Sequence, residues 1–426
     1  MDRVEEGESL RLNNRWVQLG ASLMAMIMIA NLQYSWTLFV VPMQTATGWK
    51  LSEISLAFTL FILFQTWVQP LDGWLIDWLG PRPFITVAGV LCGVGWASMG
   101  YAQTLTQLYA AYIVAGIGAA LVYSGSMGSA LKWFRDRRGL AAGIIAAGFG
   151  GGTALFIPVI GYLLRSSGYR AAFFWTGLFQ GAVIVVVAQL LRHPPADAPQ
   201  AAAAKSSPIA GRRTTQHFTT FEMLRTPHFY ALYAMFVLMA TGGLLVTAQA
   251  GPVARSWGIS ASALLLATTL NPIANGLSRI SWGWVSDRLG RENTMIVAFS
   301  LQAVCLLLVL TIGRLSPALF IVTLVLVFFT WGEVFSLFPS TSADYFGTRY
   351  ATSNYAWLYS AKGMASILGG YVAALLFERF GTWTACFYGS ATLALIAAVL
   401  AVGLRSFPLP VKRPAELPSP LAHAIE

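Results

Sequence analysis

The sequence predicts an all-α integral membrane protein with twelve transmembrane helices in two pseudo-symmetric bundles of six. Three observations support this fold class. Of the 426 residues, 56% are hydrophobic and only 10% are charged, whereas soluble globular proteins carry about 25% charged residues. Twelve apolar stretches follow one another along the chain, and one loop motif occurs in both halves. A soluble domain cannot bury so much apolar surface, so a polytopic membrane protein is predicted.

The twelve apolar stretches have the lengths of membrane-spanning helices. Most reach the about 20 residues that cross a hydrocarbon core of about 30 Å. They cover residues 16–43, 54–76, 83–103, 107–131, 139–164, 170–191, 228–250, 259–284, 294–313, 316–338, 353–377 and 382–404.

The distribution of Lys and Arg predicts the topology. With the N-terminus in the cytoplasm, 19 of the 27 Lys and Arg fall on cytoplasmic segments, six on external segments and two inside spans. The positive-inside rule therefore places both termini in the cytoplasm, as tails at residues 1–15 and 405–426, with the protein in the cell (inner) membrane. The net charge of +10 is thus a topology signal, and no basic run is left over for a nucleic-acid-binding face.

A change of composition divides the spans into six and six. The stretch "RHPPADAPQAAAAKSSPIAGRRTTQ" is rich in Pro, Ala and Ser, which is typical of a flexible linker. We expect a cytoplasmic linker at residues 192–227, between an N-terminal bundle at 16–191 and a C-terminal bundle at 228–404.

One loop motif occurs twice, after the second and the eighth spans. "GWLIDWLGPR" begins at Gly73 and "GWVSDRLGR" at Gly283, and their aspartates, Asp77 and Asp287, lie 210 residues apart. A duplicated six-span unit is typical of transporters whose binding site lies between two repeats near the membrane midplane. Both stretches resemble the signature loop of the major facilitator superfamily.

This resemblance implies a rocker-switch carrier in which charged loop residues latch one conformation. The "RDRRGLAAG" stretch after the fourth span would supply cations for the same latch. The gating residues implied are Asp77, Arg82, Asp287, Arg291, Arg135 and Arg138. The alternative is that these charges only end their helices in a solvated turn.

Three ionisable residues, Arg279, Glu333 and Lys362, lie inside apolar spans of the C-terminal half. Each is eight to eleven residues from a polar residue at the cytoplasmic end of its span, or about 12–17 Å along a helix. All three therefore reach a similar depth near the bilayer centre. Such residues cost at least about 2.5–3.5 kcal/mol each, and they are functional candidates by default.

The two cations predict an anion site. A carboxylate offers planar acceptors to the fork of Arg279 and a point contact to the ammonium of Lys362. The alternative is that Glu333 pairs permanently with one of them as a buried salt bridge. Polar and aromatic residues of the spans would line the same cavity; these are Asn31, Gln33, Tyr34, Gln65, Gln69, Tyr123, Trp331 and Tyr359. Tyr359 precedes Lys362 by one helical turn and so shares its face.

Several longer stretches are similar to the oxalate:formate antiporter branch of the superfamily. They are "NLQYSWTLF", "QPLDGWLIDWLGPR", "KWFRDRRGLAAG", "SRISWGWVSDRLGR", "FFTWGEVFSLFPST" and "SAKGMASILGG". The resemblance implies that Arg279 and Lys362 bind the substrate carboxylates. It also implies an aromatic box around a small dianion, with Gln33, Tyr34, Tyr123 and Trp331 at box positions.

The match to that branch is incomplete. Phe149 and Phe335 stand where the oxalate carrier is expected to have tyrosines, and Tyr359 where it has a tryptophan. Glu333 replaces a small neutral residue. Two cations alone suit a dianion such as oxalate, whereas an ionised Glu333 nearby would leave a net charge of +1 that suits a monocarboxylate. A Glu333 that takes up and releases a proton would couple transport to protons.

Two functions therefore stay open at this point: oxalate/formate exchange by alternating access, and proton-coupled symport of a monocarboxylate such as lactate, formate or acetate. An intramembrane enzyme is disfavoured, because no His lies at mid-membrane and no hydrolase or zinc-protease motif occurs. A receptor that kept the fold without transport is the remaining rival. We expect a monomer with no cofactor, no metal site, no ATP-binding loop and free cysteines.

Overall fold

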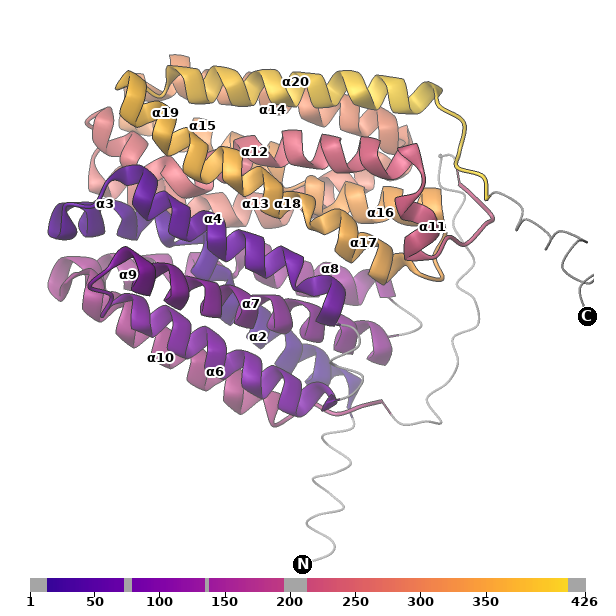
Figure 1. Ribbon diagram of the computed structural model, residues 1–426, viewed down its shortest axis with the longest axis horizontal. Coiled ribbons are helices and arrows are strands. Elements are labelled where there is room, and N and C mark those ends of the chain that lie inside the picture. The colour runs from indigo at the N-terminus through magenta and orange to yellow at the C-terminus, as the bar shows by residue number, and fades with distance from the viewer. Residues whose placement is uncertain (1–13, 73–78, 135–137, 195–212, 413–426) are drawn as a thin grey trace, which may run out of the picture.

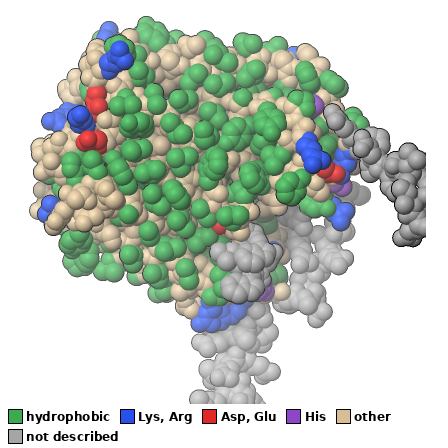
Figure 2. Space-filling model, in the orientation of Figure 1, with side chains coloured by type: hydrophobic (Ala, Val, Ile, Leu, Met, Phe, Trp, Pro, Cys, Tyr) green, Lys and Arg blue, Asp and Glu red, His purple; other side chains and the backbone are tan. Residues whose placement is uncertain are grey.

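The computed structural model describes residues 14–72, 79–134, 138–194 and 213–412. Figure 1 shows long helices running side by side. Helices of the N-terminal half, coloured indigo to magenta, form the lower part of the view, and those of the C-terminal half form the upper part. The face seen in Figure 2 is hydrophobic across its middle, with Lys, Arg, Asp and Glu gathered toward the left and right edges. This distribution is the one expected of a protein embedded in a bilayer.

The N-terminal half makes six helical passes within the described residues. Their elements are α2 (Arg15–Tyr34) with α3 (Trp36–Thr47), α4 (Leu51–Trp67), α6 (Pro81–Met99), α7 (Leu105–Trp133), α8 (Arg138–Gly151) with η1 (Gly152–Leu155) and α9 (Ile157–Ser166), and α10 (Gly168–Ala188).

The C-terminal half begins with a short helix, α11 (Thr220–Leu224), and then makes six more passes within the described residues. These are α12 (Pro227–Ser256), α13 (Ala261–Leu289), α14 (Arg291–Thr311) with η2 (Gly313–Leu315), α15 (Pro317–Trp331) with α16 (Val334–Phe346), α17 (Ala351–Tyr359) with α18 (Ala361–Ser366), the π-helical η3 (Ile367–Val372) and α19 (Ala373–Phe380), and α20 (Thr384–Ser406).

The prediction of an all-α membrane protein is confirmed. In the described part of the chain, eleven segments are long and apolar enough to cross a membrane. The twelfth pass is α13, whose 29 residues are less hydrophobic because they include Asn271, Asn275 and Arg279. A helix that accepts such residues is expected to face the protein interior rather than lipid.

Several helices begin where a hydroxyl side chain can cap them. Thr226, Ser260 and Ser316 each accept a hydrogen bond from the backbone N–H three residues later. Proline follows directly at Pro227 and Pro317. A cap satisfies one of the unpaired N–H groups of the first turn, and proline at the first helical position loses nothing there.

Four passes that the sequence predicts as continuous helices are interrupted: the fifth at η1, and three others near residues of the predicted anion site. The first breaks at Ser35, whose hydroxyl donates to the Asn31 carbonyl at 2.6 Å. The tenth breaks at residues 332–333 and the eleventh at Ser360. Irregular backbone at membrane depth is tolerated where it is enclosed by protein. The breaks in the first, tenth and eleventh passes lie next to residues of the predicted anion site.

The molecule has two distinct ends. At the linker end, on the right in Figure 1, the described linker residues and the segment after α20 lie against the C-terminal half. Lys412 forms an ion pair with Glu222 at 2.8 Å, and this hydrogen bond lowers the pKa of the Glu222 carboxyl. Phe218 N–H donates to the Phe346 carbonyl at 2.8 Å. We call the other end the opposite end.

The two halves are joined by hydrogen bonds from mid-depth to the opposite end. Ser52 donates through its backbone N–H and its hydroxyl to the two carboxylate oxygens of Glu378, both at 2.8 Å. The Thr59 hydroxyl donates to the Ser366 carbonyl at 3.0 Å. Gly251 N–H donates to the Thr37 hydroxyl oxygen at 2.5 Å. The opposite end is therefore closed in this structure.

Candidate functional site

Lys362 lies on α18 and is fully buried between the two halves. Its ammonium donates three hydrogen bonds: to Gln33 Oε1 at 2.7 Å, to Gln65 Oε1 at 3.1 Å and to the Tyr359 hydroxyl at 3.2 Å. Gln33 and Gln65 belong to the N-terminal half. The break at Ser360, just before Lys362, ends one helix and starts the next at this point.

Arg279 lies on α13 and is 7% exposed. One terminal nitrogen donates to the Ala146 carbonyl of the N-terminal half at 2.9 Å. The other donates to Asn275 Oδ1, one turn earlier on the same helix, at 3.1 Å. Arg279 and Lys362 both lie near the ring of Phe335, at 4.6 and 5.8 Å from its centroid. The structure thus brings the two predicted cations into one buried region at the boundary between the halves.

Aromatic rings surround these cations. The rings of Tyr123 and Tyr359 stack with their centroids 5.7 Å apart. Tyr34 packs against Trp331 at 6.5 Å, and Trp331 fits against α12 because Gly243 has no Cβ, which would lie 2.0 Å from the indole. The four aromatic residues predicted from the sequence therefore lie in the same region.

Two phenylalanines complete this aromatic group. The guanidinium carbon of Arg279 lies 4.6 Å from the Phe335 ring centroid. The Lys362 nitrogen lies 5.6 Å from Phe149 and 5.8 Å from Phe335. Such cation–π contacts are attractive, and they are stronger when both groups are desolvated. The rings hold the cations without neutralising their charge.

The same region contains buried hydrogen-bond donors that have no acceptor among the described residues. They are Gln33 Nε2, Gln65 Nε2, Trp331 Nε1 and Arg279 Nε. Buried polar groups in native proteins are normally paired, and each exception calls for an explanation. Unpaired donors beside two cations are complementary to an anion with several acceptor oxygens.

Glu333 does not join this group. It is fully buried at the break between α15 and α16, and neither carboxyl oxygen has a hydrogen-bond partner among the described residues. Trp331 and Phe335, two residues to either side, both line the aromatic group. Although these neighbours line the group, Glu333 forms no hydrogen bond or ion pair with Arg279 or Lys362 in the described part of the chain.

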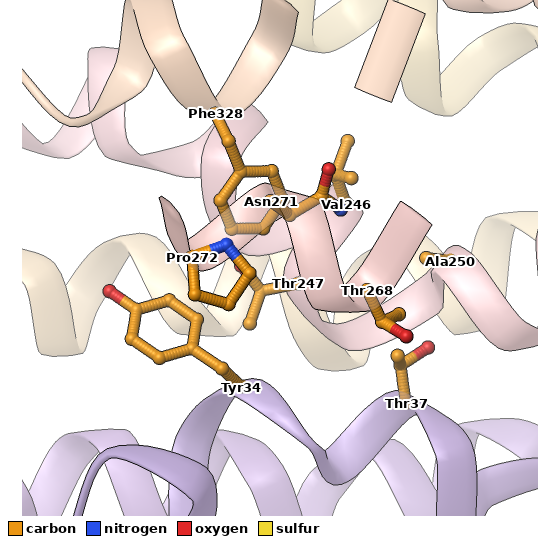
Figure 3. Close-up of a pocket in the computed structure, with 9 residues that line it drawn as sticks. All are labelled: Tyr34, Thr37, Val246, Thr247, Ala250, Thr268, Asn271, Pro272 and Phe328. Carbon is orange, nitrogen blue, oxygen red and sulfur yellow. The ribbon is translucent and has the colours of Figure 1, made fainter. Parts of the chain in front are cut away.

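A small pocket lies next to the aromatic group. It is lined by Tyr34, Thr37, Val246, Thr247, Ala250, Thr268, Asn271, Pro272 and Phe328. Figure 3 shows the Tyr34 hydroxyl pointing away from Thr37 and Thr268, so that its ring forms one wall of the pocket. The pocket contains neither of the two cations.

The structure describes only some of the residues predicted to gate the carrier. Asp77 and Arg135 lie outside the described residues, as does the side chain of Arg138. Arg82 donates to Gln189 at 2.8 Å within the N-terminal half. Arg291 pairs with Asp287 and with Asp344, at 3.0 Å each. The gating role stays a prediction.

Asp344 is not among the residues predicted to gate the carrier. It lies at the end of α16 and pairs with both Arg291 and the linker residue Arg213, the latter at 3.2 Å. It thereby ties α14, α16 and the linker together. The sequence signal for Asp344 is weak. It is an acid at the predicted cytoplasmic end of the tenth pass, to which neither Arg291 nor Arg213 belongs.

We expect Arg291→Gln to destabilise the C-terminal half. The substitution removes both ion pairs and leaves Asp344, whose side chain is 12% exposed, with one partner. Breaking a buried pair costs about 3 kcal/mol, so the thermal unfolding temperature in detergent should fall. Arg314→Gln, at an exposed position near the opposite end, is the matched control. Equal unfolding temperatures for the two variants would contradict this role.

Of two further residues of the site, Gln65 was predicted to line the cavity but not to bind substrate, and Asn275 was not singled out from the sequence. Gln65 is an amide in an apolar span, and Asn275 precedes Arg279 by four residues and so shares its helix face. An amide inside a span is a weak signal taken singly, because many such residues pair within their own bundle. What distinguishes these two is their contact with the cations.

Comparison with known proteins identifies the class to which this fold and site belong. The chain matches the Major Facilitator Superfamily over residues 21–248 and 231–424. It belongs to this family, as the duplicated loop motif predicts. Its relatives include the oxalate:formate antiporter of Oxalobacter formigenes, to which it is 40% identical over 402 residues, 94% of each chain.

Other relatives are more distant in sequence. The chain is 24% identical over 355 residues to the uncharacterized MFS-type transporter YhjX of Escherichia coli K12, covering 83% of this chain and 86% of the relative. It is 25% identical over 357 residues to monocarboxylate transporter 12-B of Danio rerio, covering 78% and 74%. The predicted resemblance to the oxalate:formate antiporter branch is confirmed at the level of the sequence.

Proposed function

We propose that this protein is a secondary transporter that exchanges oxalate for formate across a cell's inner membrane. Its two halves would move against each other around Arg279 and Lys362, with the linker end in the cytoplasm. The similarity to the antiporter supports the choice of substrates. The distribution of Lys and Arg supports the orientation. We propose that one chain is sufficient, since the site is built from the two halves of the same chain.

The observation that carries this proposal is the surplus of positive charge and donors in the site. Lys362 and Arg279 form no ion pair with a carboxylate within the described residues. Three buried donors around them, and the Nε–H of Arg279 itself, have no acceptor in the described part of the chain. An anion with oxygens at both ends, such as oxalate, supplies the acceptors and two negative charges.

The position of Glu333 bears on the choice between the two functions left open by the sequence. Because Glu333 forms no ion pair with either cation within the described residues, the two positive charges of the site are not balanced by it, which favours a dianion. The second candidate is proton-coupled monocarboxylate symport. It is favoured by one observation, that Glu333 is a buried carboxyl without a partner, and such a group inside a membrane is a candidate proton carrier.

Alternating access follows from the distribution of contacts between the halves. The opposite end is held closed by the Ser52–Glu378 and Thr37–Gly251 contacts. To open it, these hydrogen bonds must break while new contacts form at the linker end. We propose that Asp77, Arg82, Asp287, Arg291, Arg135 and Arg138 supply those contacts.

The test is counterflow in proteoliposomes. Vesicles are loaded with unlabelled oxalate, formate or lactate, and uptake of labelled oxalate is followed without a proton gradient. We expect uptake with oxalate or formate inside and little with lactate inside. Uptake of lactate driven by an inward proton gradient, and lost in Glu333→Gln, would favour the second candidate. No uptake under any condition would refute both.

A further inference from the structure

The eleventh pass contains a wide turn between the predicted anion site and the opposite end. Residues Ile367–Val372 form η3, a π-helical segment between α18 and α19. A π-helix pairs each backbone N–H with the carbonyl five residues before it, and single π-helical turns inside α-helices are rare and frequent at functional sites. Lys362 lies five residues before η3, and Glu378 lies six residues after it. The wide turn therefore lies between one cation of the site and the contact that closes the opposite end.

The wide turn determines which way these two side chains face. Lys362 and Glu378 are 16 residues apart, so in a continuous α-helix they would point about 160° apart. The extra residue taken up by the wide turn reduces this angle to about 60°. Both side chains contact α4: Lys362 donates to Gln65 at 3.1 Å, and Glu378 accepts from the Ser52 N–H at 2.8 Å. A continuous α-helix would direct them to nearly opposite faces and would lose one of the two contacts.

One side chain of the N-terminal half contacts both ends of the wide turn. The Thr59 hydroxyl on α4 donates to the Ser366 carbonyl at 3.0 Å and accepts from the Tyr371 N–H at 3.2 Å. These two backbone groups have the five-residue spacing of a π-helix, whereas in an α-helix the Tyr371 N–H would pair with the Ile367 carbonyl. Gly370 makes room for this contact, because a Cβ there would lie 2.6 Å from the Thr59 hydroxyl oxygen. The Thr59 hydroxyl therefore favours the π-helical pairing.

We propose that Thr59 is a positioning residue that couples closure of the opposite end to the anion site. Its hydroxyl stabilises the wide turn, and the wide turn directs Lys362 and Glu378 toward α4 at the same time. When the opposite end opens, α4 carries Thr59 away from η3, and the turn relaxes toward α-helical pairing. Lys362 then turns away from Gln65. The inference rests on the proposed function for the role of Lys362, and it adds how the movement of the halves reaches that residue.

Thr59→Val removes the hydroxyl and keeps the shape of the side chain. Thr66→Val is the matched control, because Thr66 lies two turns further along the same buried face of α4 and its hydroxyl donates within its own helix, to the Ile62 carbonyl at 2.9 Å. When the purified proteins are titrated with oxalate, we expect Thr59→Val to bind about tenfold more weakly, the net effect of about two hydrogen bonds. Thr59→Ser, which keeps the hydroxyl, and Thr66→Val should bind like the wild type.

A second readout needs no ligand. Ser55 is buried and contacts Gln249 of the other half at 3.0 Å, so a cysteine at this position reports opening of the opposite end through its reaction with an impermeant maleimide. Labelling should be faster in Thr59→Val than in Thr59→Ser or Thr66→Val. Deletion of Leu368, a 37% exposed residue of η3, removes the extra residue and leaves a continuous α-helix with both flanking segments in their present directions. In this background Thr59→Val should change neither oxalate binding nor labelling.

Three results would overturn the inference. The first is faster labelling of Thr59→Val with unchanged oxalate binding, which would assign Thr59 to closure alone. The second is an equal effect of Thr59→Val with and without the deletion, since the hydroxyl would then not act through the wide turn. The third applies if the deletion variant does not fold: Gly370→Ala, whose Cβ displaces the Thr59 hydroxyl, should reproduce both effects of Thr59→Val, and wild-type behaviour would contradict this. Absence of oxalate binding in the wild type would refute the proposed function, whereas labelling would still show whether Thr59 acts through the wide turn.

Discussion

Replacing Lys362 by glutamine is expected to abolish oxalate exchange. The substitution leaves Gln33 and Gln65 in place but removes the charge that attracts the substrate. Loss of one partner of a buried charge pair costs about 2–5 kcal/mol, so oxalate affinity should fall about 100-fold or more. Affinity is measured by titrating the purified protein with oxalate, and exchange by counterflow.

Arg279→Gln should show a similar loss, since it removes the second cation and the contact to the Ala146 carbonyl. Lys50→Gln is the control, because Lys50 is exposed near the opposite end, outside the site. The interpretation would be contradicted if Lys362→Gln bound and exchanged oxalate like Lys50→Gln. A variant that binds normally but does not exchange would assign Lys362 to gating instead.

Gly251→Val is expected to hold the opposite end open. A Cβ at Gly251 would lie 2.3 Å from the Thr37 backbone carbonyl oxygen, which belongs to the other half. Backbone cannot give way as a flexible side chain does, and overpacking of this kind costs about 1–3 kcal/mol. The closed state should therefore be disfavoured and oxalate exchange slowed about tenfold or more, while oxalate still binds.

The conformational part of this prediction has its own readout. A cysteine at Ser55, which contacts Gln249 of the other half at 3.0 Å, should react faster with an impermeant maleimide in Gly251→Val. Gly389→Val is the matched control, because nothing lies within 4 Å of a Cβ at Gly389. Slow labelling in both variants, with normal exchange, would show that the Thr37–Gly251 contact does not govern closure.

The all-helical fold follows from the sequence because each pass must bury about 20 apolar residues, a requirement that composition alone reveals. The interruptions at Ser35, Gly332 and Ser360 do not follow from it. Serine and glycine occur at many regular positions of these helices, and only the packing between halves makes a break acceptable. The order of the passes and the resemblance between the two halves could be predicted, because the same loop motif occurs after the second and the eighth spans.

The charged residues of the site could be predicted from the sequence. Arg279 and Lys362 are costly in a membrane wherever they point, so their presence alone signals a role. The predicted depth in the membrane placed Glu333 beside the two cations. Depth alone does not show which neighbours a side chain contacts. The contacts of Gln65 depend on how α4 of one half meets α18 of the other. No local sequence pattern determines how these two helices pack against each other.

The charge carried per cycle tests the central claim most directly. Exchange of external oxalate for internal formate moves one net negative charge inward, whereas symport of a monocarboxylate with a proton moves none. Labelled oxalate uptake into formate-loaded proteoliposomes is measured at imposed potassium–valinomycin potentials. An interior-positive potential should accelerate uptake and an interior-negative one should slow it, with no effect of a proton gradient. Uptake that ignores the potential and follows the proton gradient would contradict a site of two uncompensated cations.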